Sequence, residues 1–104
     1  MEPTTLLHTL ELPIVEIEKI CKKYYICKLS VFGSFIHGSA SRESDVDVLV
    51  EFLPGHTPGF AFGGIENELS QLLDRKVDLQ TAESLSKYFR EDVIAEAVTI
   101  YAEN

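Results

Sequence analysis

The sequence has few basic residues, no long apolar run and only two cysteines. Nine Lys and Arg stand against seventeen Asp and Glu in 104 residues, which gives a formal net charge of −8. Because such a surface repels phosphate backbones, the composition disfavours a nucleic-acid polymer as the main ligand. No apolar stretch approaches the roughly 20 residues that a membrane span requires, and no apolar N-terminal segment precedes a cleavage site. The sequence therefore predicts a protein without a membrane partner.

The two cysteines, Cys21 and Cys27, have a spacing that fits neither a zinc site nor a redox pair. We interpret them as small apolar core residues in a reducing, cytoplasmic compartment. No repeat, linker or low-complexity tract divides the chain, and its length is near the commonest domain size. We therefore expect residues 1–104 to form a single domain.

Hydrophobic periodicity predicts alternating helices and strands. Apolar residues recur at helical spacing in residues 13–25, 62–73 and 85–97, and Gly63 and Gly64 are expected in the first turn of the second helix. A short helix or turn is expected over residues 35–40. Strands are expected at residues 26–32, 45–52, 76–81 and 98–101. This order predicts an α/β fold, a two-layer arrangement in which helices pack on a mixed sheet of about four strands.

Two aspartates stand out on the strand predicted at residues 45–52. Asp45 and Asp47 are two residues apart, so they share one face of the strand about 7 Å apart along the backbone. If their side chains converged to ~4 Å, the two charges would repel by about 4 kcal/mol at an effective dielectric of 20, which a cation would relieve. Carboxylate oxygens of this kind select Mg²⁺ or Mn²⁺. The alternative interpretation is a sheet with one solvated acidic face, and neighbouring motifs must decide between the two.

Gly33-Ser34 ends the strand predicted at residues 26–32 and offers backbone N–H groups and a hydroxyl to a phosphate. This pair shares a sheet edge with Asp45 and Asp47 if the two strands are antiparallel. Asp78 joins that edge if its own strand runs parallel to residues 45–52, and residues 53–75 are long enough for the crossover helix. One topology thus brings a phosphate cradle and three carboxylates together.

This combination of motifs resembles the nucleotidyltransferase superfamily of DNA polymerase beta. Within it, the chain is most similar to the minimal nucleotidyltransferase (MNT) antitoxins that pair with HEPN toxins. The resemblance covers most of the chain, through Gly33-Ser34-Phe35 with Gly38, residues 44–51, Pro58-Gly59, residues 76–79 and residues 90–101. It implies a minimal polymerase-beta-type fold and transfer of AMP from ATP to a hydroxyl, a tyrosine of the partner HEPN toxin, which is thereby neutralised.

The resemblance also implies a role for each site residue. Asp45 and Asp47 would bind two Mg²⁺ ions, and Asp78 would complete the metal site and help to deprotonate the acceptor hydroxyl. Gly33 and Ser34 would hold the phosphates of ATP. The sequence departs from its relatives at one point, because Ile36-His37 stands where they often carry Ala-Arg, and whether His37 replaces that arginine is left open.

Other interpretations remain at this point. The chain could be a binding module that covers the toxin without chemistry, although a binder has no need for three mutually repelling acids. It could instead transfer a nucleotide to a small hydroxylated molecule, which needs more substrate-binding structure than this length provides. An oligomer with the partner is left open. Phe60 and Phe62 could flank an adenine, but core packing is the favoured interpretation. Three basic residues could contact phosphate, although scattered bases are more often surface groups: Arg42, Arg75 and Lys76.

Overall fold

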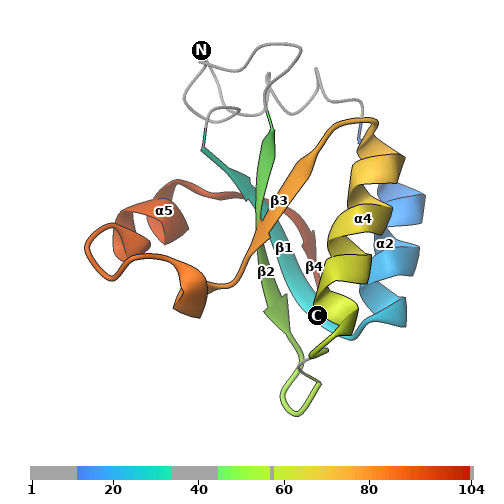
Figure 1. The fold of residues 1–104 in the computed structure, drawn as a ribbon, viewed down its shortest axis with the longest axis horizontal. Coiled ribbons are helices and arrows are strands. Elements are labelled where there is room, and N and C mark those ends of the chain that lie inside the picture. The colour runs from blue at the N-terminus through green and yellow to red at the C-terminus, as the bar shows by residue number, and fades with distance from the viewer. Residues whose placement is uncertain (1–11, 34–44, 57, 104) are drawn as a thin grey trace.

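The computed structural model describes residues 12–33, 45–56 and 58–103. Their centre is a sheet with the strand order β3-β2-β1-β4 (Figure 1). β1 pairs antiparallel with β2 and β4, whereas β2 pairs parallel with β3. The predicted mixed four-stranded sheet is therefore confirmed, with bounds of Ile26–Phe32 for β1, Val46–Phe52 for β2, Val77–Gln80 for β3 and Val98–Ala102 for β4. The short helix or turn predicted at residues 35–40 lies outside the described residues.

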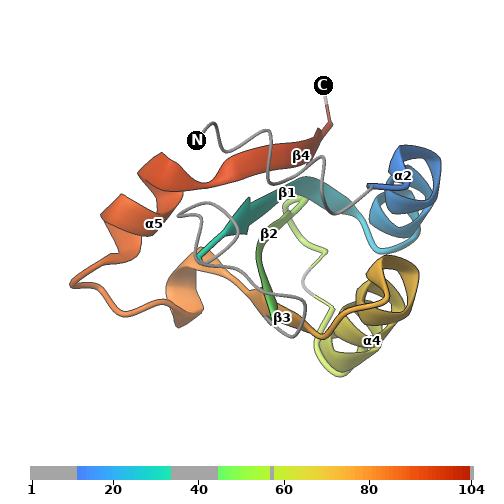
Figure 2. The same cartoon turned by 90° about the horizontal axis from the view of Figure 1, so that it is seen from above.

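Two helices, α2 (Ile14–Lys23) and α4 (Ala61–Leu73), cover one face of the sheet (Figure 2). Each has an apolar stripe at helical spacing, and the stripes meet the valines and leucines that alternate along the strands. Gly63 and Gly64 lie in the first turn of α4, as predicted. Among the described residues, no helix combines the length and the apolar character needed to cross a membrane. The fully buried side chains of this core are Ile17, Cys21, Ile26, Leu29, Val31, Val46, Val48, Val50, Ile65, Leu69 and Val77.

Among the described residues, the other face of the sheet is covered only in part, by a segment that we call the arm, residues 81–97. The arm contains a short 3₁₀ helix, η1 (Ala82–Ser84), a turn, and α5 (Arg90–Glu96). It projects from the sheet on the side away from α2 and α4 (Figure 1). The prediction of one amphipathic helix over residues 85–97 is wrong, because only Arg90–Glu96 is α-helical and none of its residues is buried.

Local hydrogen bonds explain why the arm is not one helix. Thr81 and Ser84 form a capping box that fixes the start of η1, and the chain leaves the helix in an extended conformation at Leu85. The Ser86 hydroxyl accepts a hydrogen bond from the backbone N–H of Tyr88 and so supports a turn there. The Arg90 guanidinium donates to the carbonyl oxygens of Ala82, Glu83 and Leu85 at 2.6, 3.3 and 3.0 Å. These bonds fold the segment back on itself and fix its shape.

The outer edge of β3 is closed by side chains of α4. The Ser70 hydroxyl accepts from the N–H of Val77 at 2.9 Å, and the Glu66 carboxylate accepts from the N–H of Leu79 at 2.8 Å. An open strand edge invites pairing with another chain, and here the helix that joins β2 to β3 occupies those donors. α4 therefore both makes the parallel crossover and holds β3 in its register.

Replacing Glu66 with alanine should destabilise the fold. The N–H of Leu79 would lose its acceptor next to the core, which costs about 1–3 kcal/mol for a buried donor. Chemical denaturation measures the change in the free energy of unfolding, with Asn67→Ala, on the exposed side of the same helix, as the matched control. An equal effect of the two substitutions would contradict a special role of Glu66.

Candidate active site

Gly33 and the three predicted carboxylates meet at one end of the sheet, where β1 ends and where β2 and β3 begin. We call this end of the sheet the carboxylate edge. Asp47 lies opposite Phe32 in the antiparallel pair and opposite Asp78 in the parallel pair. Both pairings that the sequence analysis required are therefore present. Gly33 directly follows β1, and Asp45 directly precedes β2. The remaining predicted phosphate ligand, Ser34, lies outside the described residues, as do His37 and Arg42.

Gly33 is in close contact with the Asp47 side chain. Its φ is +76°, a left-handed conformation that L side chains rarely adopt. A Cβ atom at this position would overlap Oδ2 of Asp47 and lie 3.0 Å from its Cγ. Only glycine therefore lets the Asp47 carboxylate lie against the backbone where β1 ends.

Asp47 is half-buried and sits near two other acids. Burial, followed by the negative charges of Asp78 and Asp45, raises the pKa of the Asp47 carboxyl above its ordinary value. The ionised form is thus disfavoured by its surroundings. A bound cation would reverse this effect, because it favours the charged carboxylate.

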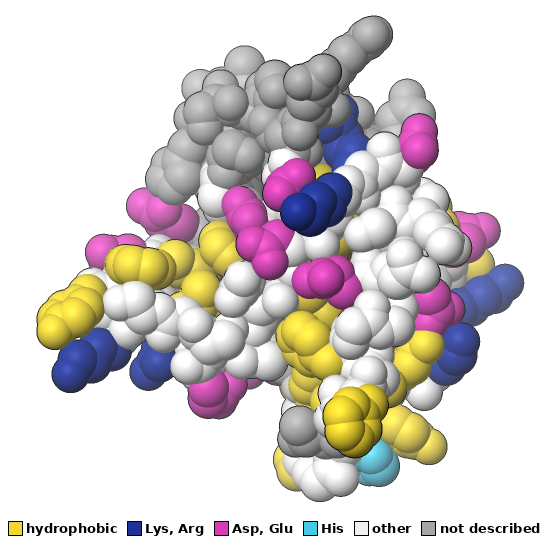
Figure 3. Space-filling view, in the orientation of Figure 1, with side chains coloured by type: hydrophobic (Ala, Val, Ile, Leu, Met, Phe, Trp, Pro, Cys, Tyr) yellow, Lys and Arg dark blue, Asp and Glu magenta, His cyan; other side chains and the backbone are white. Residues whose placement is uncertain are grey.

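Asp45 and Asp78 each have a polar neighbour. Lys76 Nζ lies 3.9 Å from Oδ2 of Asp45, and both side chains are largely exposed, so this ion pair contributes little to stability. Gln80 donates a hydrogen bond of 3.1 Å to Oδ1 of Asp78. Figure 3 shows a basic side chain among several acidic ones on this face. The sequence analysis did not single out Gln80, although its position two residues beyond Asp78 places both on one face of β3.

The donor set fits magnesium. Within the described part of the chain, no three His, Cys, Asp or Glu side chains form a metal-binding cluster by themselves. Mg²⁺ is usually held by one or two carboxylates together with water and substrate phosphates, rather than by a closed protein cage. Asp47 and Asp78, which lie side by side on neighbouring strands, offer the hard oxygen ligands that this mode requires. Nucleotide phosphates would supply the others.

The aromatic residues of the α4 region lie away from this edge. Phe62 is partly buried and packs against Phe52, with ring centroids 6.3 Å apart, so the favoured interpretation of core packing is confirmed for it. Phe60 is fully exposed, and core packing is wrong for that residue. A groove of about 610 Å³ lies at the opposite end of the sheet from the carboxylates, and its lining includes Phe52, Pro58 and Phe62. Phe52 is the last residue of β2, whereas Asp47 is near its start.

The fold and this edge of carboxylates define a nucleotidyltransferase domain, and comparison with known families agrees. Residues 15–104 match a family model with the description "Polymerase beta, Nucleotidyltransferase". The chain therefore belongs to the polymerase beta nucleotidyltransferase family, and its resemblance to the minimal members is confirmed.

Curated relatives are of similar length to this chain. One is the protein adenylyltransferase MntA of Thermococcus cleftensis, 33% identical over 84 residues that cover 80% of this chain and 83% of that protein. Another is a Methanocaldococcus jannaschii protein that bears the name of a protein adenylyltransferase. It is 36% identical over 84 residues, covering 74% of this chain and 84% of that protein. Both names describe enzymes, in agreement with the nucleotidyltransferase family of this chain.

Solved structures share the fold. A minimal nucleotidyltransferase superposes with a TM-score of 0.67 at 31% identity, covering 94% of this chain and 95% of that one. A toxin–antitoxin structure with AMP-PNP gives a TM-score of 0.70 at 23% identity, covering 89% and 76%. A complex of a tri-AMPylated Shewanella oneidensis HEPN toxin with an MNT antitoxin gives 0.63 at 20% identity, covering 90% and 73%. At these low identities the last two show the fold alone.

Replacing Asp47 with asparagine should stabilise the metal-free protein at neutral pH. The pKa of Asp47 is higher in the folded than in the unfolded chain, so folding becomes less favourable as pH rises through that interval. The neutral amide removes this penalty. In metal-free buffer the variant should have the higher Tm at pH 7, and the difference should vanish below about pH 4, where aspartate is protonated in both states. Glu18→Gln, which removes the same charge from the exposed surface of α2, is the control. An Asp47→Asn variant no more stable than the parent at pH 7 would contradict the electrostatic argument.

Replacing Gly33 with alanine should displace the Asp47 carboxylate. Gly55→Ala is a matched control, because Gly55 also has a positive φ, of +82°, but no atom lies within 4 Å of the added Cβ. The backbone conformation costs about 1–2 kcal/mol in each variant, and only Gly33→Ala adds the clash. Combining Gly33→Ala with Asp47→Ala should recover that additional loss in a double-mutant cycle of unfolding free energies. Additive single effects would show that the contact between Gly33 and Asp47 is unimportant.

Proposed function

We propose that this chain is a Mg²⁺-dependent protein adenylyltransferase that transfers AMP from ATP to a tyrosine hydroxyl of a partner HEPN toxin and thereby neutralises it. The observation that carries the proposal is the pairing of Asp47 with Asp78 across β2 and β3, with Gly33 against Asp47. The names of the relatives support the reaction, and the AMPylated HEPN toxin bound to an MNT antitoxin of the same fold supports the acceptor.

The residues at the edge have distinct roles in this mechanism. Asp45, Asp47 and Asp78, together with phosphate oxygens of the nucleotide, would hold Mg²⁺, which would supply charge neutralisation for the triphosphate and the departing pyrophosphate. Gly33, together with Ser34 of the sequence motif, lets the phosphates approach the backbone N–H groups closely. Asp78, whose carboxylate is oriented by Gln80, accepts the proton of the acceptor hydroxyl. The hydroxyl oxygen then bonds to the α-phosphorus of ATP, and the bond to pyrophosphate breaks.

The pKa of Asp47 connects nucleotide binding to this site. Without a cation, burial and its acidic neighbours disfavour the charged carboxylate. The ionised ligand set is therefore stabilised when ATP arrives with its counter-ions. This coupling favours a catalyst over a simple binding module, because a surface that only covers a toxin gains nothing from mutually repelling acids.

The double variant Asp45→Asn with Asp47→Asn should remove transfer and leave the fold intact. We expect at least about a 100-fold loss in the rate at which α-labelled ATP labels the HEPN toxin, since even indirect supports of a metal ligand contribute 10–100-fold. Circular dichroism checks the fold. Glu51→Gln, which removes an exposed acid four residues beyond Asp47, should label the toxin at the parent rate.

Residual toxin activity, measured as this protein is titrated against the toxin with and without ATP, distinguishes catalysis from steric covering. A catalyst silences a molar excess of toxin, only in the presence of ATP, and the toxin stays silent after the two proteins are separated. Silencing at one-to-one stoichiometry without ATP, or unchanged labelling by the double variant, would overturn the enzymatic proposal.

A further inference from the structure

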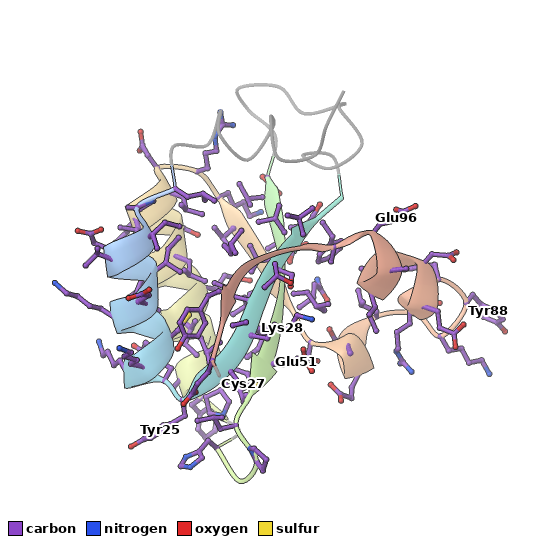
Figure 4. All side chains as sticks on the ribbon, turned by 180° about the vertical axis from the view of Figure 1, so that it is seen from behind. Tyr25, Cys27, Lys28, Glu51, Tyr88 and Glu96 are labelled. Carbon is purple, nitrogen blue, oxygen red and sulfur yellow. The ribbon has the colours of Figure 1, made fainter. Side chains whose placement is uncertain are left out.

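The arm, residues 81–97, exposes an unusual amount of apolar surface. Tyr88, Phe89 and Ile94 are 84%, 51% and 47% exposed. Among the described residues, seven large hydrophobic side chains are exposed, and these three fall within seven consecutive positions. Figure 4 shows Tyr88 at the outer tip of the arm. Clusters of this kind mark interaction sites more often than scattered single residues do.

The arm is held in one shape although its helix buries no residue. Arg90 binds three backbone carbonyl oxygens of the segment that precedes it, and Thr81 and Ser84 cap each other. These bonds are internal to the arm, so they fix the positions of Tyr88 and Phe89 without covering them. A surface ordered before binding loses less entropy when a partner is bound.

The arm stands next to the carboxylate edge on the same face of the sheet. Leu49 is buried but lies outside the main core. It lines a small cavity of about 80 Å³ together with Ile94 and Ala97 of the arm. Leu49 is two residues beyond Asp47, about 7 Å along β2 and on the same face. β3 leads from Asp78 into the arm after two further strand residues. The end of the arm that contains Ile94 and Ala97 therefore lies on the same face as the site, and a protein bound along the arm can extend to it.

The charges of the arm indicate the chemistry of that molecule. The arm carries four exposed acidic residues, whereas Arg90 is engaged with the backbone and Lys87 lies 5.5 Å from the ring of Tyr88. The matching surface is apolar with basic residues around it. A second copy of this chain, with net charge −8 and the same acidic arm, does not provide that surface. The acidic residues are Glu83, Glu91, Asp92 and Glu96.

We propose that the arm is the docking surface for the protein acceptor of AMP, which contacts it through an apolar patch ringed by basic residues. This inference rests on the proposed function for the identity of the acceptor. Binding by the arm positions the acceptor hydroxyl next to Asp47 and Asp78, so the arm acts on acceptor affinity and not on nucleotide binding.

The test measures affinity for the HEPN toxin without ATP, by titration calorimetry. Tyr88→Ser with Phe89→Ser should raise the Kd for the toxin at least about tenfold, a loss of 1.4 kcal/mol. Glu91→Lys with Asp92→Lys should weaken binding and reduce its dependence on salt. The matched control, Tyr25→Ser with Phe60→Ser, removes two exposed aromatic rings from the region away from the carboxylate edge and should bind as the parent does. The single variant Tyr88→Ser replaces the double one if the latter does not fold.

Kinetics distinguish docking from general damage. In the arm variant the KM for toxin should rise, kcat at saturating toxin should stay at the parent value, and the thermal shift with Mg²⁺ and AMP-PNP should be unchanged. If the parent binds toxin but transfers no label, the proposed function fails while the calorimetric comparison still decides the role of the arm. The inference would be overturned if the arm variant bound the toxin with the parent's affinity or if the parent did not bind the toxin. Self-association through the arm instead of toxin binding would also overturn it.

Discussion

The parallel pairing of β2 with β3 is the interaction on which the site depends. It places Asp78 directly opposite Asp47, and this register is set by the crossover through α4. α4 does more than connect the strands, because its Glu66 and Ser70 side chains bind the outer N–H groups of β3. A slip of β3 by one residue would turn Asp78 toward the core and Val77 toward solvent. α4 therefore holds the proposed catalytic residues Asp47 and Asp78 in register.

β2 carries both the buried valines that stabilise the fold and the aspartate whose charge its surroundings disfavour. Val46, Val48 and Val50 are fully buried, and each contributes about 1.5–3 kcal/mol by leaving water. Asp47 lies between two of them on the opposite face, where burial and neighbouring acids disfavour its charge. Because alternate side chains of β2 lie on opposite faces, burial of the valines on one face offsets the electrostatic cost of Asp47 on the other. Perturbed pKa values of this kind cluster at functional sites.

Sequence reasoning recovered what depends on local pattern. Alternation located the strand that carries Asp47, and topology rules placed Asp78 beside it. It failed for the arm, because Leu85, Tyr88 and Phe89 have helical spacing but the shape is decided by side-chain bonds of Arg90 to backbone carbonyls. Sequence reasoning explained the glycine at position 33 only by phosphate binding. The overlap of a Cβ atom there with Asp47 was not predictable, because the two residues are fourteen positions apart and only the folded sheet brings them together. Contacts between distant segments are not visible in periodicity.

The two faces of the sheet divide the work of a very small domain. Among the described residues, α2 and α4 cover one face of the sheet, and the arm and the proposed site lie on the other. The net charge of −8 then restricts what can approach that open face. A nucleotide is itself an anion, so it gains affinity only when cations accompany it, and a protein acceptor gains affinity when it brings basic residues of its own. Under the proposed function, the same acidity that disfavours a nucleic-acid polymer favours a nucleotide bound with its counter-ions and a basic partner.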